Sequence, residues 1–400
     1  MAVGSFVPMM KQPKSAYDLI NASVQVVGGF SSLTEFYNEA FVNLYGGVKW
    51  KNLFNIGSPS VEETWSQTSM KNYLPSMARY LAFDAEKPKL VTRGFSGSSG
   101  NMPRMGISTS YNEKSLNDGL KIINNYAGRP DLQGIYNSFV LSNTDLINSM
   151  HMRMNYSAFQ IESTGKLVMT EIDNGGGVTD VEFDFRVPAT NKRKAGGFGA
   201  KGKKLAWSDE NAYPIGDLID MDKYATDHFM VLDVFRMDKQ TWQMLVDHPT
   251  TKRAVMVKAT NGLIQQAYLG DYPVDDEAVQ AYLTNTLKLP RVEIVDEIAA
   301  ADVYDKETRK VIQKPVRSFK PGTVVLRKSG KIGTVQWSLP TLEFSTPGNP
   351  VFTVENGMFQ IQNETWTKNR AREISAEFTG IPVLEISQNI LYLDVTQAAS

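Results

Sequence analysis

The spacing most suggestive of chemistry lies in a glycine-rich, basic stretch. Gly197, Gly199 and Gly202 match the GxGxxG spacing of dinucleotide-binding loops, and together with Lys203 they match most of a phosphate-binding loop. Both motifs need a strand before the loop and a helix start after it, because helix amides bind the phosphates. Lys204 stands where a phosphate loop carries Ser or Thr. We therefore interpret residues 192–204 as a basic loop, mobile or interfacial, that binds no nucleotide.

The remaining reactive residue types form no coherent active site in the sequence. His151, His228 and His248 are far apart, so no pair has the spacing of metal ligands. The chain has no cysteine, which excludes disulfides and thiolate chemistry. We expect no catalytic residue, no metal site and no cofactor. This favours a structural or binding role, with an α/β enzyme of unrecognised site as one alternative.

The composition of the chain argues against two kinds of binding partner, nucleic acid and membranes. The 42 Lys and Arg residues balance 43 Asp and Glu residues, whereas a protein that holds nucleic acid through its bulk charge is usually basic. No apolar run approaches eighteen residues and no signal-peptide pattern is visible, so we expect no membrane association. Four hundred residues exceed one ordinary core, which predicts two or three lobes.

One long helix followed by a hairpin organises the chain. Apolar residues recur every three or four positions over 143–164, which predicts a helix that Gly165 ends. Its apolar face comprises Leu146, Ile147, Met150, Met154, Ala158 and Ile161. Alternating residues then predict strands over 166–173 and 178–186, joined at the Asn-Gly-Gly-Gly turn 174–177. A long helix on a sheet predicts an α+β core.

The pattern of apolar and polar residues changes after His228, and the new pattern predicts a second lobe of α/β type. The expected strands are 229–235, 292–298 and 323–327, and the expected helices are 238–247 and 275–287. A short helix is expected near 215–221, and strands return over 378–394.

Two segments are unable to bury their own apolar residues locally. Residues 30–45 form a short amphipathic helix with a capping box at Ser32 and Glu35, but Gly and Pro surround it. Residues 92–106 are rich in Gly and Ser and have no core pattern, which indicates a linker or an extended two-stranded loop. We expect both segments to act between subunits.

The order of these features resembles the major capsid proteins of tailed bacteriophages, closest to the lambda-type capsid family with the Hong Kong 97 fold. Residues 90–111 resemble that family's extended loop, and residues 139–167 resemble its spine helix and the Gly-Lys exit. The strand, Trp-Ser and helix sequence at 181–185, 207–210 and 214–218 is similar, as are the strand and turn segments at 292–305 and 321–326. The resemblance spans roughly residues 60–395.

This resemblance implies a Hong Kong 97-like α+β fold with a spine helix on a β-sheet. Residues 1–60 would form an N-terminal arm, and 61–125 would include the extension loop. Residues 126–221 and 346–400 would form the peripheral domain, and 222–345 the α/β axial domain at capsomer centres. The implied function is self-assembly, as hexamers and pentamers, into the icosahedral head shell around double-stranded DNA. The alternative within virions is a tail or other structural protein.

The resemblance also implies partners and contact residues. Scaffold, portal and decoration proteins are possible partners of the family, packaged DNA would be contacted only non-specifically, and the location would be the virion capsid, assembled in the host cytoplasm. The arm and the loop would supply the subunit interface. Its expected residues are Leu33, Phe36, Tyr37, Phe41, Leu44, Arg93, Phe95, Met102, Arg104 and Met105.

Overall fold

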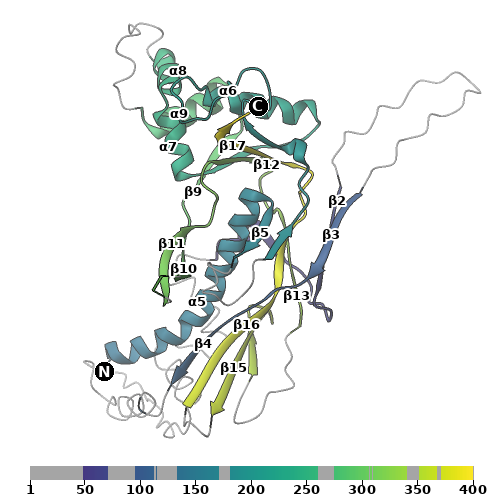
Figure 1. Ribbon diagram of the computed structural model, residues 1–400, viewed down its shortest axis with the longest axis vertical. Coiled ribbons are helices and arrows are strands. Elements are labelled where there is room, and N and C mark those ends of the chain that lie inside the picture. The colour runs from purple at the N-terminus through teal and green to yellow at the C-terminus, as the bar shows by residue number, and fades with distance from the viewer. Residues whose placement is uncertain are drawn as a thin grey trace, which may run out of the picture.

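The protein is mixed α+β, as the sequence predicts, and is drawn in Figure 1 from a computed structural model. The structure describes residues 48–70, 95–111, 114, 133–170, 181–259, 274–305, 307–308, 310–339, 351–366 and 371–399. The predicted arm helix at 30–45 lies outside these residues. Among the described helices, none has an apolar stretch of the length that crosses a lipid bilayer.

The predicted spine helix is α5, Gln133–Thr164. Its end is confirmed, because Gly165 takes a left-handed φ of 70° and its amide bonds the Ile161 carbonyl. Its predicted start is wrong, since the helix begins at Gln133 rather than Asn143. Asn143 therefore lies inside the helix. Its local preference for a helix start is outweighed by the longer helix of which it is part. All six residues of the predicted apolar face are buried.

A six-stranded sheet underlies α5, which packs against β16 and β4. The strand order is β1-β13-β16-β15-β14, and β4 pairs with the free side of β16. The bounds are β1 Phe54–Ile56, β4 Arg104–Tyr111, β13 Gly333–Trp337, β14 Val351–Val354, β15 Phe359–Trp366 and β16 Ala371–Leu384. Residues 104–106 were expected in a loop without core contacts, and they instead begin a strand of the subunit's own sheet.

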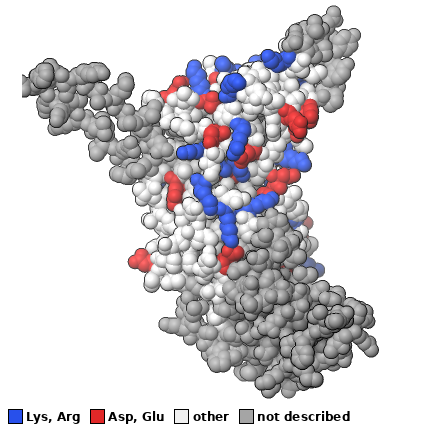
Figure 2. Space-filling model, turned by 180° about the vertical axis from the view of Figure 1, so that it is seen from behind, with Lys and Arg blue, Asp and Glu red and all other residues white. Residues whose placement is uncertain are grey.

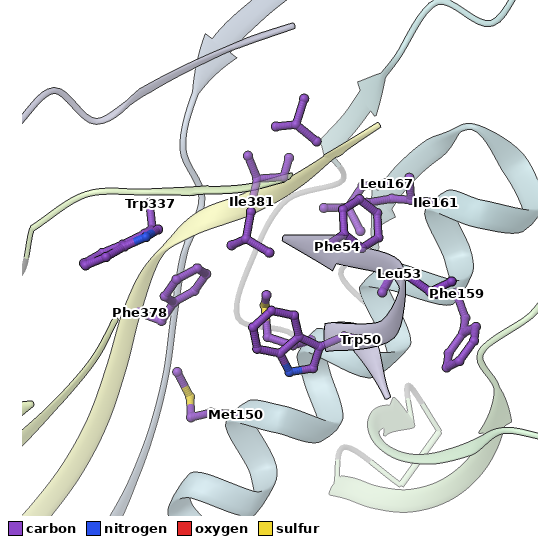
Figure 3. Close-up of a cluster of buried hydrophobic side chains, with 14 of the residues drawn as sticks. Trp50, Leu53, Phe54, Met150, Phe159, Ile161, Leu167, Trp337, Phe378 and Ile381 are labelled. Carbon is purple, nitrogen blue, oxygen red and sulfur yellow. The ribbon is translucent and has the colours of Figure 1, made fainter. Parts of the chain in front are cut away.

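The first hydrophobic core lies between α5 and this sheet. The short helix α3, Trp50–Leu53, inserts Trp50 between the two layers, where it is fully buried. Figure 3 shows Trp50 within this cluster, with Met150 of α5 and Phe378 of β16 to its left and Leu53 and Phe159 to its right. Burying side chains of this size contributes about 1.5–3 kcal/mol each.

Three two-stranded ribbons extend this body. Strands β5 and β6 form the hairpin that follows the spine helix, which confirms its prediction, although its turn lies outside the described residues. Strands β2 and β3 form the ribbon that projects to the right in Figure 1, and β10–β11 lies beside α5. The bounds are β2 Thr64–Met70, β3 Phe95–Asn101, β5 Lys166–Met169, β6 Val181–Asp184, β10 Ile298–Asp305 and β11 Lys310–Arg317.

A second lobe holds a five-stranded sheet and its own core. The strand order is β7-β17-β12-β8-β9, with bounds β7 Lys192–Ala195, β8 Val234–Asp238, β9 Arg291–Val295, β12 Thr323–Arg327 and β17 Ile390–Ala398. The helices are α6 Pro214–Asp227, α7 Lys239–Asp247, α8 Pro249–Ala259 and α9 Asp276–Ala281, with the 3-10 turn η2 Ala189–Asn191 and the π-helical turn η4 Tyr282–Thr286. Strand β17 lies between the two cores, because Leu391, Leu393 and Val395 belong to this second core while Ile390 and Tyr392 belong to the first.

The predicted strand at 229–235 is wrong in its first half. Strand β8 begins only at Val234, and Phe229 has a left-handed φ of 60°. The chain turns there because the Met230 amide bonds the Ala225 carbonyl at the end of α6. Phe229 and Val231 are consequently exposed, at 53% and 77%.

Candidate functional site

The glycine-rich loop that follows β7 packs against α6. The Gly196 amide donates to Asp217 Oδ1 at 2.8 Å, and the Gly202 amide donates to Asp220 Oδ2 at 2.7 Å. Trp207 Nε1 donates to the other Asp217 oxygen at 2.7 Å. These two loop amides bind side-chain carboxylates, which explains the glycine spacing without a phosphate.

Close approach requires glycine at several positions of this loop. A Cβ on Gly202 would lie 2.0 Å from Asp217 Oδ1, and a Cβ on Gly199 would lie 2.5 Å from Asp220 Cγ. Burial raises the pKa of Asp217 to about 6, although the hydrogen bonds from Trp207 and Gly196 act in the opposite direction. The loop is thus a fixed part of the second lobe.

The outer side of the same segment carries a cluster of cations. Arg193, Lys194, Lys201, Lys203 and Lys204 are all exposed. Among the described residues, Lys194, Lys201 and Lys203 form no ion pair, because the nearby carboxylates of α6 are buried beneath the loop. We call residues 193–204 the basic edge. The face shown in Figure 2 mixes both signs of charge.

A second polar cluster is centred on His151, which is fully buried in α5. Trp50 Nε1 donates to His151 Nδ1 at 3.2 Å, and His151 Nε2 lies 3.1 Å from Glu355 Oε1. Lys51 Nζ lies 2.5 Å from the other oxygen of Glu355. Because Nδ1 accepts a hydrogen bond, the ring proton belongs on Nε2, where it faces the carboxylate. The cluster fastens α3 to the spine helix.

Burial and neighbouring charges set the ionisation of this cluster. Burial lowers the pKa of His151, and Glu355 offsets this only in part. Burial alone would raise the pKa of Glu355, but hydrogen bonds from His151 and Lys51 lower it below its ordinary value. The neutral histidine beside a charged glutamate is a structural arrangement, as expected for a packed residue.

A third cluster joins the two lobes. Glu162 near the end of α5 is fully buried, and its Oε1 lies 2.6 Å from Arg327 Nε and 2.8 Å from Arg236 Nε. Arg236 also pairs with Glu293 at 2.6 Å. The two arginines come from β12 and β8, so one carboxylate connects the spine helix to the middle of the second sheet.

A cleft of about 410 Å³ opens beside this cluster. Its walls include Lys49, Arg236, Glu293 and Glu297, so it carries both signs of charge. Lys49 pairs with Glu297 and Arg236 with Glu293, so these wall charges satisfy one another rather than facing the cleft unpaired. No described group of His, Asp and Glu side chains has the arrangement of a metal site.

The predicted interface residues fall in different surroundings. Met102 is buried at 8% exposure in its own subunit's core, and half-buried Met105 packs against that core. Arg104 is exposed and pairs with Glu377 of β16. Phe95 begins β3, while Arg93 and the five arm residues lie outside the described part of the chain. Their role between subunits stays a prediction.

Sequence reasoning missed Asp217, Asp220 and Glu162 as the residues that hold these arrangements together. A signal was present for the first two, since acids at i and i+3 share one helix face, here among buried apolar residues. No local signal marks Glu162, because its partners come from strands far along the chain.

No protein-family model and no curated protein matches the chain, but solved structures do. A phage-related protein from Bordetella bronchiseptica RB50 is 10% identical, with 92% of this chain and 99% of that chain covered and a TM-score of 0.45. The capsid protein of a prophage from E. coli CFT073 is 14% identical, with 97% and 99% covered and a TM-score of 0.47. The capsid of Myoviridae phage XM1 is 10% identical, with 87% and 91% covered and a TM-score of 0.37.

These neighbours are named as a phage-related protein and two phage capsid proteins. Because each of these TM-scores is below 0.5, we base the proposed function on this chain's own residues and arrangement.

Proposed function

We propose that this chain is the major capsid protein of a tailed phage, with a Hong Kong 97-like fold. It assembles through hexamers and pentamers into an icosahedral head shell around double-stranded DNA. The observation that carries the proposal is the placement of α5, which lies along the sheet at β16 and β4 and reaches the second lobe at Glu162. The order of segments in the sequence resembles that family from the extension loop to the last strand.

Three features of the arrangement support a shell subunit. The spine helix and its sheet form one lobe, and the five-stranded sheet with its helices forms the other (Figure 1). Ribbon β2–β3 projects from the first lobe, where Gln336 bonds both the Ser66 amide and its carbonyl. Buried Trp65 and Gln67 hold β2 on the body, while β3 pairs only with β2 among the described strands and so offers its other backbone edge to a neighbouring subunit. An elongated two-lobed subunit with such a ribbon suits a sheet-like shell.

The test is assembly of the purified full-length chain. We expect fast-sedimenting material that negative-stain microscopy resolves as closed, rounded shells. Rings or tubes would assign the chain to a tail or another virion component, and a monodisperse monomer at all protein concentrations would favour the enzyme alternative. Either result overturns the proposal.

A further inference from the structure

The short helix α3 is fastened to the spine helix by two hydrogen bonds from one residue. The Trp50 amide donates to Asn155 Oδ1 at 2.8 Å, and Trp50 Nε1 donates to His151 Nδ1 at 3.2 Å. The Trp50 and His151 rings also stack, with 22° between their planes. No described side chain caps the start of α3. Because a helix of four residues has little stability of its own, its position depends on contacts such as these.

His151 is enclosed between α3 and the turn that joins β14 to β15. On the side away from Trp50, its Nε2 lies 3.1 Å from Glu355 Oε1, and Lys51 pairs with the other oxygen of Glu355 at 2.5 Å. Among the described residues, Glu355 and Lys51 are the charged groups that act on the imidazole. The ring of Phe359 in β15 meets it edge-on, with 5.1 Å between the ring centres, and carries no charge.

The turn that presents Glu355 has an uncommon backbone conformation. Glu355, Asn356 and Gly357 follow one another with left-handed φ values of 53°, 58° and 93°. Residues other than glycine adopt this region at a cost in energy, and they persist there only where the surrounding contacts fix them. Glu355 is also 6% exposed despite its charge. The carboxylate is therefore held in place opposite His151 Nε2.

A second proton on the ring conflicts with one of its two partners. Neutral His151 carries its proton on Nε2 and accepts the hydrogen bond of Trp50 on Nδ1. The imidazolium carries a proton on both nitrogens, so Nδ1–H would face Trp50 Nε1–H at hydrogen-bond distance. Glu355 stabilises the added charge through Nε2. The contact that protonation breaks is therefore the one to Trp50.

We propose that His151 is an acid-sensitive latch that holds α3 on the spine helix at neutral pH and releases it on acidification. Strand β1 stays paired with β13, so the release is confined to the segment around Trp50. Residues 1–47 join the body through this segment, and the latch thus sets how firmly the predicted arm is anchored. The inference goes beyond the proposed function, because it concerns the single subunit and does not depend on shells.

The pH range follows from the direction of the pKa shift. Burial lowers the pKa of His151 from 6.5, and Glu355 offsets this only in part. Release of Trp50 uncovers the ring and returns its pKa towards the ordinary value. The closed arrangement is consequently most stable above pH 6.5, and it loses stability as the pH falls from 6.5 towards the lowered pKa.

Hydrogen–deuterium exchange of the unassembled full-length chain, followed by mass spectrometry, measures the latch. Each exchange rate is divided by the intrinsic rate at that pH, so that only the frequency of opening is compared. The amides of Trp50 and Asn52 report on α3, while β12 and β17 report on the second lobe. From pH 7.5 to pH 5.0 we expect α3 to open at least about fivefold more often, with both strands still protected.

Two variants of the cluster should change this response in opposite directions. His151→Gln keeps an acceptor for Trp50 but has no group that titrates in this range, so α3 should open equally at both pH values. Glu355→Gln removes the charge that stabilises the imidazolium, so the rise in opening should exceed that of the wild type. His228→Gln removes an exposed histidine of the second lobe and should retain the wild-type response. Circular dichroism melting checks that each variant is folded.

Three results would overturn the latch. One is an α3 that opens equally at both pH values in the wild type, and another is an unchanged pH response in His151→Gln. The third is loss of protection in β12 and β17 together with α3, which would mean that the whole subunit unfolds. A Glu355→Gln response no larger than that of the wild type would also count against it, and this comparison stands even where His151→Gln fails to fold. Shell formation, which tests the proposed function, is measured separately.

Discussion

Glu162 and Arg327 form a buried ion pair in which Oε1 lies 2.6 Å from Nε. Glu162 is fully buried and Arg327 is 2% exposed. Arg327 Nη1 also donates to the Lys328 and Gly330 carbonyls, so the guanidinium is held on several sides. The pair fixes the end of the spine helix against β12, and with it the junction between the two lobes.

Glu162→Ala is expected to destabilise the subunit by about 3–5 kcal/mol, because it leaves two arginines near the core without their carboxylate. Glu162→Gln keeps one acceptor and should cost less. Urea unfolding of the unassembled subunit, followed by circular dichroism, measures both. Glu182→Ala removes a half-exposed partner of Lys166 and should cost less than about 1 kcal/mol. Equal effects at Glu162 and Glu182 would contradict the account of this junction.

The His151 cluster predicts a dependence of stability on pH. Burial lowers the pKa of His151 from 6.5, so the unfolded chain binds more protons than the folded chain just below that pH. The free energy of unfolding should therefore be highest above pH 6.5 and fall as the pH drops towards the lowered pKa. Protonation at Nδ1 would also place two donors together, since Trp50 Nε1 already points there.

Urea titrations between pH 5 and 8 test this dependence by comparison with His151→Gln. Asp217 acts in the opposite direction, because its raised pKa of about 6 makes the fold less stable as pH rises from 3.8 to 6. The difference between wild type and His151→Gln isolates the histidine. His228→Gln changes an exposed ring and should retain the wild-type slope. An unchanged slope in His151→Gln would show that the histidine is not responsible.

The close approach of the glycine loop to α6 predicts a steric effect. Gly202→Ala places a Cβ against Asp217 Oδ1 and should destabilise the subunit by about 1–3 kcal/mol. Gly106→Ala is the comparison and should cost less, because its Cβ would lie 3.3 Å from the Ala376 carbonyl oxygen, a contact that a small shift can relieve. Calorimetric titration of the wild type with ATP should give no saturable heat. Saturable binding, or an unaffected Gly202→Ala variant, would reopen the nucleotide interpretation of this loop.

Sequence patterns predicted those elements whose signals are local. The apolar face of α5, its glycine end, strand β12 and helix α7 all follow from spacing and from end residues such as Asp238, whose carboxylate caps α7. The predicted segment 229–235 shows the limit, because a run of apolar residues does not reveal the left-handed turn at Phe229. Local composition could not distinguish an exposed apolar tip from a buried strand.

The three polar clusters could not be predicted in the same way. His151 meets Trp50 and Glu355, which lie far from it in the sequence on either side. Their pairing depends on how α3 and the β14–β15 turn are brought to the spine helix. The partners of the glycine loop were equally hidden, because its amides bond carboxylates that come later in the chain.

The arm helix remains a prediction from sequence. Phe36→Ser with Phe41→Ser should leave the body folded and reduce or abolish shell formation, because these side chains would bury their apolar surface on a neighbouring subunit. Melting of the unassembled subunit, beside microscopy of assembly, measures both effects. A sharply lowered melting temperature of the subunit itself would mean that the helix packs within its own chain.

Cryo-electron microscopy of the assembled wild-type protein tests the central claim most directly. The account predicts a closed icosahedral shell built of hexamers and pentamers, with a helix about 48 Å long along each subunit, the length expected for the 32 residues of α5. Particles without icosahedral symmetry, or a shell whose subunits lack this helix over a sheet, would contradict it.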